Sequence, residues 1–246
     1  MAKIGALIFD FDGTLLDTET PEYHAWQQIY REHGASLTLA EWLEGVGTWY
    51  AFDPYTDLER KLGRPLDRAA IQARLKALHH DVLLEMGLRD GVEGLLHEAR
   101  RRGLKLAVAS SSDHRWVDAH LARYGLLDAF DAILCRDDVL PGRSKPHPDL
   151  YLAALEALGA SAQETIAFED SLNGVRAAKA AGLFVVAVAN AVTQHLPLGE
   201  ADLVVHSFEE VNLDRLQPLF ARAMSRSATR PALRALSGRS ARCAAV

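Results

Sequence analysis

The stretch that decides the fold is Ile8-Phe9-Asp10-Phe11-Asp12-Gly13-Thr14, in which two carboxylates follow an apolar run. Residues 6–9 read as a buried parallel strand, because such strands continue in apolar residues. Side chains two apart on a strand share a face, so Asp10 and Asp12 are expected to lie close together. Two like charges held that close need a cation or a shared proton. The stretch therefore predicts a ligand site at the carboxyl end of the first strand, where open α/β sheets bind ligands.

A hairpin turn is the competing interpretation of Asp12 and Gly13, since Asp-Gly pairs close many β-hairpins. The rest of the chain disfavours a hairpin, because its further apolar runs are separated by helical patterns. Strands separated by helices imply right-handed crossovers and a parallel sheet. The strands expected after the first are residues 104–109, 132–134, 165–168, 184–188 and 203–205.

A helical block separates the first strand from the rest of the expected sheet. Residues 18–89 contain helical patterns and no convincing strand; Trp26, Ile29, Tyr30 and His33, for example, follow the spacing of one helix face. A block of this size reads as an insertion that caps the sheet. Four of its aromatic side chains either line a substrate pocket or form the core of the insertion, and the core is expected for at least two of them: Trp42, Trp49, Tyr50 and Phe52.

The composition predicts a cytoplasmic enzyme. A chain of 246 residues allows one or two domains with a sizeable core, and a net charge of −6 argues against a general nucleic-acid binder. Cys135 and Cys243 are too few for a disulfide framework, which fits a reducing compartment. The apolar run of residues 4–9 is too short for a signal peptide or a membrane span. We expect a monomer that acts on a small molecule, without nucleic-acid or membrane partners.

The C-terminal segment, residues 216–246, differs in composition. From Ala221 onward it contains six arginines and no acidic residue. Four of the arginines recur at every fourth position, which would stripe one helix face, but Pro231 and Gly238 weaken such a helix. We expect a disordered, solvated tail. A basic arm for an acidic partner or a membrane surface is the alternative.

Three further polar loops follow expected strands, so they lie at the same edge of the sheet as Asp10. Ser110-Ser111-Ser112 offers hydroxyls and N–H groups that suit an anion, although a plain serine N-cap is equally consistent. Lys145, flanked by prolines, presents either a fixed positive charge or an ordinary solvated side chain. Glu169 and Asp170 offer carboxylate ligands for a hard cation, or an acidic N-cap.

Taken in chain order, these residues resemble the four motifs of the haloacid dehalogenase superfamily. The motifs are Asp10-Phe11-Asp12-Gly13-Thr14, Ser110, Lys145-Pro146 and Glu169-Asp170, and the resemblance covers residues 1 to about 210. It implies an α/β fold: a Rossmann-like parallel sheet core with an inserted helical cap domain. The core is expected from residues 1–17 and 90–215, and the C1-type cap from residues 18–89. Val-Ala-Ser-Ser-Ser and Phe-Glu-Asp-Ser-Leu-Asn-Gly-Val look most like the β-phosphoglucomutase-like branch, which includes many sugar and polyol phosphatases.

The resemblance also implies roles for individual residues. Asp10 would be the nucleophile that forms an aspartyl phosphate, and Asp12 would protonate the leaving group and then activate water. Ser110 would hold the phosphoryl group, and Lys145 would balance the carboxylate charges. Haloalkanoate dehalogenases of the superfamily lack the second aspartate, because a carbon–chlorine bond needs no protonated leaving group. The presence of Asp12 therefore favours a phosphoric monoester hydrolase.

The same resemblance implies a Mg²⁺ cofactor. The ion would be held by the carboxylates of Asp10 and Asp170 and the backbone carbonyl of Asp12, with Glu169 in support. Further contacts to the phosphate are expected from three residues of the same motifs: Thr14, Ser111 and Asn173.

Two alternatives stay open. The first is a β-phosphoglucomutase, which must grip a second phosphate with cations. Thr48 and Asp113 stand where such mutases place an arginine and a lysine, and Glu22 stands where they place a histidine, so these positions disfavour it. The second is a protein with a structural Mg²⁺ site whose Arg-rich tail binds a partner.

Overall fold

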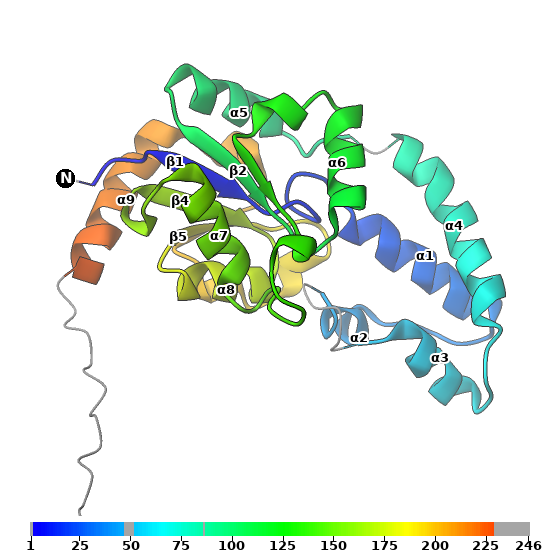
Figure 1. Cartoon of the computed structure of the whole chain (residues 1–246). Coiled ribbons are helices and arrows are strands. Elements are labelled where there is room, and N and C mark those ends of the chain that lie inside the picture. Colours follow the sequence, from blue (N-terminus) through cyan, green and yellow to red (C-terminus); the bar gives the residue numbers. More distant parts are fainter. Residues whose placement is uncertain (1, 47–51, 86, 229–246) are drawn as a thin grey trace, which may run out of the picture.

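A parallel sheet of six strands runs through the residues that the computed structural model describes, which are 2–46, 52–85 and 87–228, with backbone only for 79–85 and 227–228 (Figure 1). Its strand order is β3-β2-β1-β4-β5-β6. After β1 the chain adds β2 and β3 on one side of that strand, and then β4, β5 and β6 on its other side. The order of the strands therefore reverses between β1 and β4. The strands are β1 (Ala6–Phe9), β2 (Lys105–Ala109), β3 (Ala132–Leu134), β4 (Thr165–Glu169), β5 (Phe184–Val188) and β6 (Leu203–Val205).

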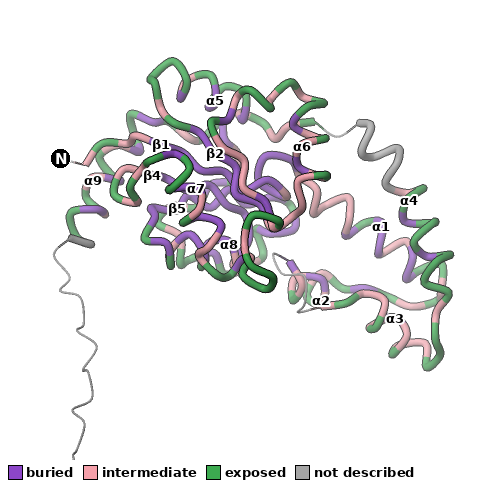
Figure 2. The backbone as a smooth tube through the Cα atoms, in the orientation of Figure 1, coloured by how far each residue is buried: buried purple, intermediate pink, exposed green. Residues whose placement is uncertain are grey.

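Both faces of the sheet are buried, which explains the continuous apolar runs. On β1, Leu7 and Phe9 pack into the hydrophobic cluster on one face, while Ala6 and Ile8 pack into the cluster on the other. Successive side chains point to opposite faces of a strand, so a strand covered on both sides needs apolar residues throughout. Figure 2 shows the central strands buried along their length. The expected α/β fold with a parallel sheet is confirmed.

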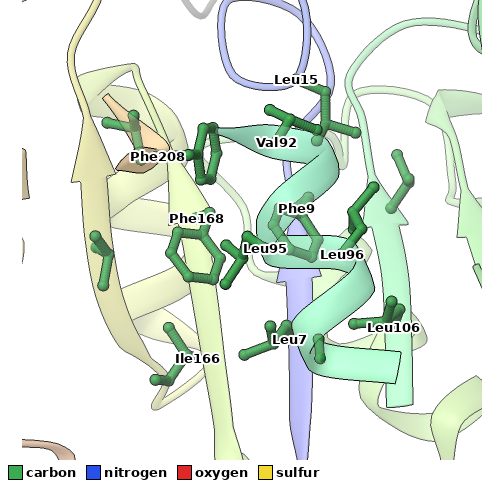
Figure 3. Close-up of a cluster of buried hydrophobic side chains, with 14 of the residues drawn as sticks. Leu7, Phe9, Leu15, Val92, Leu95, Leu96, Leu106, Ile166, Phe168 and Phe208 are labelled. Atoms are coloured by element: carbon green, nitrogen blue, oxygen red, sulfur yellow. The ribbon is translucent and has the colours of Figure 1, made fainter. Parts of the chain in front are cut away.

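Helices cover the two faces. Helix α5 (Val92–Arg101) buries an i, i+3, i+4 stripe of Val92, Leu95 and Leu96 against the first cluster (Figure 3). Helices α6 (His114–Arg123) and α9 (Leu213–Ala228) contribute to the same cluster. Helices α7 (Asp149–Leu158) and α8 (Leu172–Ala180) pack on the other face. Short 3₁₀ helices lie in the loops of the same domain: η1 (Leu127–Ala129), η2 (Arg136–Asp138), η3 (Ala162–Glu164), η4 (Thr193–His195), η5 (Leu198–Glu200) and η6 (Phe208–Glu210).

The helical insertion forms a body beside the sheet (Figure 1). It consists of α1 (Glu19–Glu32), α2 (Leu39–Leu43), α3 (Pro54–Leu62) and α4 (Arg68–Glu85). Of the predicted helix face, Trp26, Ile29 and Tyr30 are buried in its hydrophobic cluster, and His33 is half-buried. Trp42 is a buried member of that cluster and Phe52 packs against it, so the expectation of two aromatic core residues holds; Trp49 and Tyr50 lie outside the described residues.

Two linkers join the insertion to the sheet, and they run side by side. Leu16 and Leu88 form an antiparallel bridge, and the backbone N–H of Arg89 donates to the carbonyl of Leu15 at 2.9 Å. We propose that the boundaries between core and cap lie in these linkers, near residues 17 and 90.

The expectation of a disordered tail from residue 216 is wrong for residues 216–228, which belong to α9. Leu216, Phe220 and Met224 are buried, and the ring of Phe220 lies 5.8 Å from that of Phe184 on β5. The arginines masked an apolar stripe on the opposite helix face, whose burial stabilises the helix. Residues 229–246 lie outside the described residues. Among the helices described, none combines the length and apolar character that a membrane span requires.

Candidate active site

Three buried carboxylates meet where β1 and β4 end side by side. The N–H of Asp10, just past β1, donates to the carbonyl of Phe168 on β4 at 2.9 Å. Glu169 ends β4, and Asp170 follows it. Ligand oxygens of Asp10, Glu169 and Asp170 all lie within 4.8 Å of one another. The site therefore lies at the point where the chain changes direction across the sheet, which is where α/β sheets bind ligands.

Lys145 enters this cluster as a buried cation. Its Nζ donates to the carboxylate of Asp10, and to Oε1 of Glu169 at 2.5 Å. The hydroxyl of Tyr151, on α7, donates to the same Glu169 oxygen at 2.6 Å. One ammonium thus contacts two of the three carboxylates, and two negative charges remain in the cluster when all three are ionised.

The pKa values reflect this imbalance. Burial, aided by Glu169, raises the pKa of Asp10 to about 7 although Lys145 lowers it. Burial and the charges of Asp10 and Glu169 raise the pKa of Asp170 well above its usual range. Burial lowers the pKa of Lys145, but the two carboxylates it contacts raise it further, so the lysine stays charged. The negative charge of these buried carboxylates is not fully balanced by Lys145. Their oxygens fit a hard divalent cation such as Mg²⁺.

Two glycines make the close approach of these carboxylates possible. Gly13 has a φ of 79°, and a Cβ there would lie 2.1 Å from Oδ2 of Asp170. A Cβ on Gly174, in α8, would lie 2.0 Å from the carboxylate oxygens of Glu169. Both distances are far inside van der Waals contact, so only glycine fits. This explains why a glycine follows each acidic motif.

The side chain of Asp12 is held apart from the cluster. Ser112 Oγ donates to its Oδ2 at 2.6 Å, and Trp116 Nε1 donates to its Oδ1 at 2.8 Å. The expectation that Asp10 and Asp12 lie close together on one face is wrong, because side chains alternate regularly only within a strand and β1 ends at Phe9. The Asp10 carboxylate instead lies with those of Glu169 and Asp170. The half-buried Asp12 carboxylate is instead fixed by the start of α6.

The serine loop lies beyond the end of β2. Ser110 is fully buried, and its Oγ accepts the N–H of Ser112 at 3.0 Å. The hydroxyl of Ser111 is buried and has no hydrogen-bond partner within the part of the chain that the structure describes. A buried hydroxyl without a partner is costly, and an oxyanion in this loop would satisfy it.

The other two predicted phosphate contacts have different surroundings. Thr14 is buried, and its hydroxyl donates to Oδ1 of Asp170 at 3.4 Å. Asn173 is half-buried in the first turn of α8. The structure therefore places Thr14 at the carboxylate cluster and Asn173 on the helix that follows it.

Sequence reasoning missed three side chains that hold this site: Trp116, Tyr151 and Asn190. Tyr151 and Trp116 lie on helix faces, where an aromatic residue usually indicates core. Asn190 follows the carboxyl end of β5, the same kind of position as the other loops, but a lone amide carries no charge that would mark it. Its Nδ2 donates to Oδ2 of Asp170 at 2.8 Å.

The described residues at the positions that distinguish a mutase from a phosphatase form hydrogen bonds within their own helices. Asp113 is the N-cap of α6 and accepts the N–H of Trp116 at 3.0 Å. Glu22 accepts from the indole N–H of Trp26 at 2.9 Å. Thr48 lies outside the described residues. Neither described position supplies a positive charge for a second phosphate.

A cavity of about 580 Å³ lies at the linkers between the helical insertion and the sheet. Its lining includes Asp17, Arg89 and Asn190, and, among the described residues, neither Asp10 nor Lys145. The cavity therefore adjoins the carboxylate cluster through Asn190 and does not contain it.

Comparison with known proteins yields a consistent set of similarities. A family model described as haloacid dehalogenase-like hydrolase matches residues 4–182. YhcW of Bacillus subtilis, whose name assigns it provisionally to the phosphatases, is 43% identical over 210 residues, covering 85% of this chain and 94% of that protein. The Escherichia coli fructose-1-phosphate phosphatase YqaB is 31% identical over 192 residues, covering 76% and 97%. The crystal structure of CbbY from Rhodobacter sphaeroides in complex with phosphate is 32% identical with a TM-score of 0.66, covering 84% of this chain and 96% of that one.

Proposed function

The chain belongs to the haloacid dehalogenase-like hydrolases, and we propose that it is a Mg²⁺-dependent phosphatase that hydrolyses the monophosphate of a sugar or polyol. The resemblance seen in its motifs is confirmed at the level of the family. The names of YhcW and YqaB support a phosphoric monoester hydrolase. The name of YqaB, a fructose-1-phosphate phosphatase, supports a small phosphorylated carbohydrate as the substrate.

The observation that carries this proposal is the buried cluster of Asp10, Glu169 and Asp170, in which the ammonium of Lys145 contacts the first two. Asp10 and Asp170, with the backbone carbonyl of Asp12 and support from Glu169, would hold the Mg²⁺ ion. When bound, Mg²⁺ supplies positive charge beside the phosphoryl oxygens and the attacking carboxylate. The buried acidic donors fit that ion because Mg²⁺ binds through few carboxylates and keeps several waters.

In the first half of the reaction, Asp10 attacks the phosphorus atom of the ester. A bond forms between a carboxylate oxygen and phosphorus while the bond from phosphorus to the ester oxygen breaks. Asp12 gives a proton to the departing alkoxide. Lys145 lowers the pKa of Asp10 against the effect of burial and holds its carboxylate in place through their direct contact.

In the second half, water attacks the phosphorus of the aspartyl phosphate while Asp12 takes a proton from that water. Inorganic phosphate leaves and Asp10 is regenerated. Ser110, Ser111, Thr14 and Asn173 would bind phosphoryl oxygens in both halves, and the cap would exclude bulk water.

A panel of phosphate esters tests the proposal. Sugar and polyol monophosphates should release inorganic phosphate with Mg²⁺, a chelator should abolish the release, and Asp170→Ala should raise the Mg²⁺ requirement. With β-glucose 1-phosphate and a trace of its bisphosphate, conversion to glucose 6-phosphate without phosphate release would establish the mutase alternative instead. No turnover across the panel, with Mg²⁺ still bound, would support a structural role for the site. Full activity in chelator would refute the Mg²⁺ site.

A further inference from the structure

Asn190 connects the end of β5 to the acidic cluster. It is buried, and its Nδ2 donates to Oδ2 of Asp170 at 2.8 Å and to the carbonyl of Gly13 at 3.3 Å. The amide thus touches both acidic loops, one after β1 and one after β4. An amide NH₂ has two hydrogens, so both bonds can form at once.

The rest of the Asn190 amide is committed to its own turn. Its Oδ1 accepts the backbone N–H groups of Val192 at 2.9 Å and Thr193 at 2.8 Å. The backbone N–H of Asn190 donates to the hydroxyl of Thr193 at 3.0 Å. Two donors fix the oxygen end of the amide, so the NH₂ end must face Asp170. The orientation of this amide therefore follows from the hydrogen-bond network.

Arg89 steadies the same point from the linker side. Its guanidinium donates to the carbonyl of Gly13 at 2.8 Å and to the carbonyls of Val188 at 2.6 Å and Ala189 at 2.7 Å. The Gly13 carbonyl is thereby held by both Arg89 and Asn190. The peptide that lies against Asp170 has little freedom to shift.

We propose that Asn190 is a positioning residue that orients Asp170 toward the divalent cation, an inference that rests on the proposed Mg²⁺ site. The hydrogen bond from Asn190 occupies Oδ2 of Asp170. The other oxygen, Oδ1, receives only a long hydrogen bond of 3.4 Å from Thr14 among the described residues, so it is available to the ion. A neutral amide holds the carboxylate without adding positive charge, so the cluster keeps its attraction for a cation. Partners of this kind commonly change metal affinity by about 10- to 100-fold when removed.

The variant that tests this role is Asn190→Ser. A serine oxygen can still accept the N–H groups of the turn, but it is too short to reach Asp170. Thr193→Val is the matched control, because it removes the hydroxyl from the same turn and leaves the bond between Asn190 and Asp170 intact. Circular dichroism and the melting temperature without Mg²⁺ establish that each variant folds.

Two quantities are measured for each variant. The first is the Mg²⁺ concentration that gives half of the maximal rise in melting temperature, and the second is the Mg²⁺ concentration that gives half of the maximal activity. Asn190→Ser should raise both by about 10- to 100-fold, with kcat largely recovered at saturating Mg²⁺, while Thr193→Val should match wild type. Equal requirements in Asn190→Ser and wild type, or an equal rise in Thr193→Val, would overturn the inference. A wild-type protein that responds to Mg²⁺ in neither assay would instead refute the proposed function.

Discussion

Individual residues set the charge balance of the site and fix the position of Asp12, the proposed proton donor. Asp12 is held by one hydroxyl and one indole N–H, both neutral donors from the start of α6. Holding both carboxylate oxygens limits where the group can deliver a proton. Proton transfer by a well-placed side chain typically contributes about 10²- to 10⁴-fold in rate, and it matters most for a poor leaving group.

Trp116→Phe should therefore lower kcat on sugar phosphates by about tenfold, a fraction of the full general-acid contribution. Formation of the aspartyl phosphate from 4-nitrophenyl phosphate should be little affected in a rapid-mixing assay, because that leaving group needs no proton. The control is Trp42→Phe in the cap, since the Trp42 indole N–H is buried without a partner among the described residues. Equal losses of the rapid phase with both esters would contradict a role for Trp116 in positioning Asp12.

Single side chains were also what the sequence predicted least well. Asp10, Glu169 and Asp170 could be found because they follow apolar runs at one edge of the sheet, whereas Lys145 was found through its place in the order of the motifs. Asn190 occupies an equivalent place after β5, but a lone amide has no charge or motif to mark it. Trp116 acts through one N–H at the edge of a core face, a contact that only the packing of α6 reveals.

Among the elements, α9 shows how composition can hide a buried stripe. Leu213, Leu216, Phe220 and Met224 recur on one side of a helix that also carries exposed arginines. Strands were predicted to within a residue, because buried parallel strands are continuous apolar runs bounded by turns. Helix α9 was missed because arginine, alanine and polar residues separate its buried positions, and because Pro218 lies inside it.

Phe220→Ala should destabilise the protein by about 3–5 kcal/mol, because it removes a fully buried ring that contacts β5. Leu219→Ala is the matched control on the same helix, since Leu219 is 44% exposed and should cost within about 0.5 kcal/mol. Urea unfolding followed by circular dichroism gives both free energies. Similar values for the two variants would mean that this helix does not pack as described.

In the molecule as a whole, the two linkers and Arg89 connect the helical insertion to the edge of the sheet where the carboxylate cluster lies. Arg89 donates to carbonyls from the Gly13 loop, from the end of β5 and from His206 beyond β6. The strand order places these segments side by side, so one guanidinium can bridge them. Arg89 therefore ties the second linker to three loops at this edge of the sheet.

Arg89→Lys should lower stability, because a single ammonium cannot satisfy all of these carbonyls and each buried one left unpaired costs about 1–3 kcal/mol. Arg101→Lys is the control, since Arg101 is exposed and its hydrogen bonds among the described residues go to Glu98 on its own helix. Thermal unfolding compares the two. A melting temperature that falls equally in both variants would show that Arg89 has no special role as an anchor.

The proposed mechanism requires that Asp10 carry the phosphoryl group during turnover. The most direct measurement is rapid acid quenching of the enzyme during turnover of a sugar phosphate, followed by mass spectrometry of the peptide that contains residues 4–14. The phosphoryl group should be found on Asp10 at a level that rises and decays with turnover, and Asp10→Asn should show neither this species nor activity. Turnover without a phosphorylated peptide, or near-normal activity in Asp10→Asn, would contradict the account.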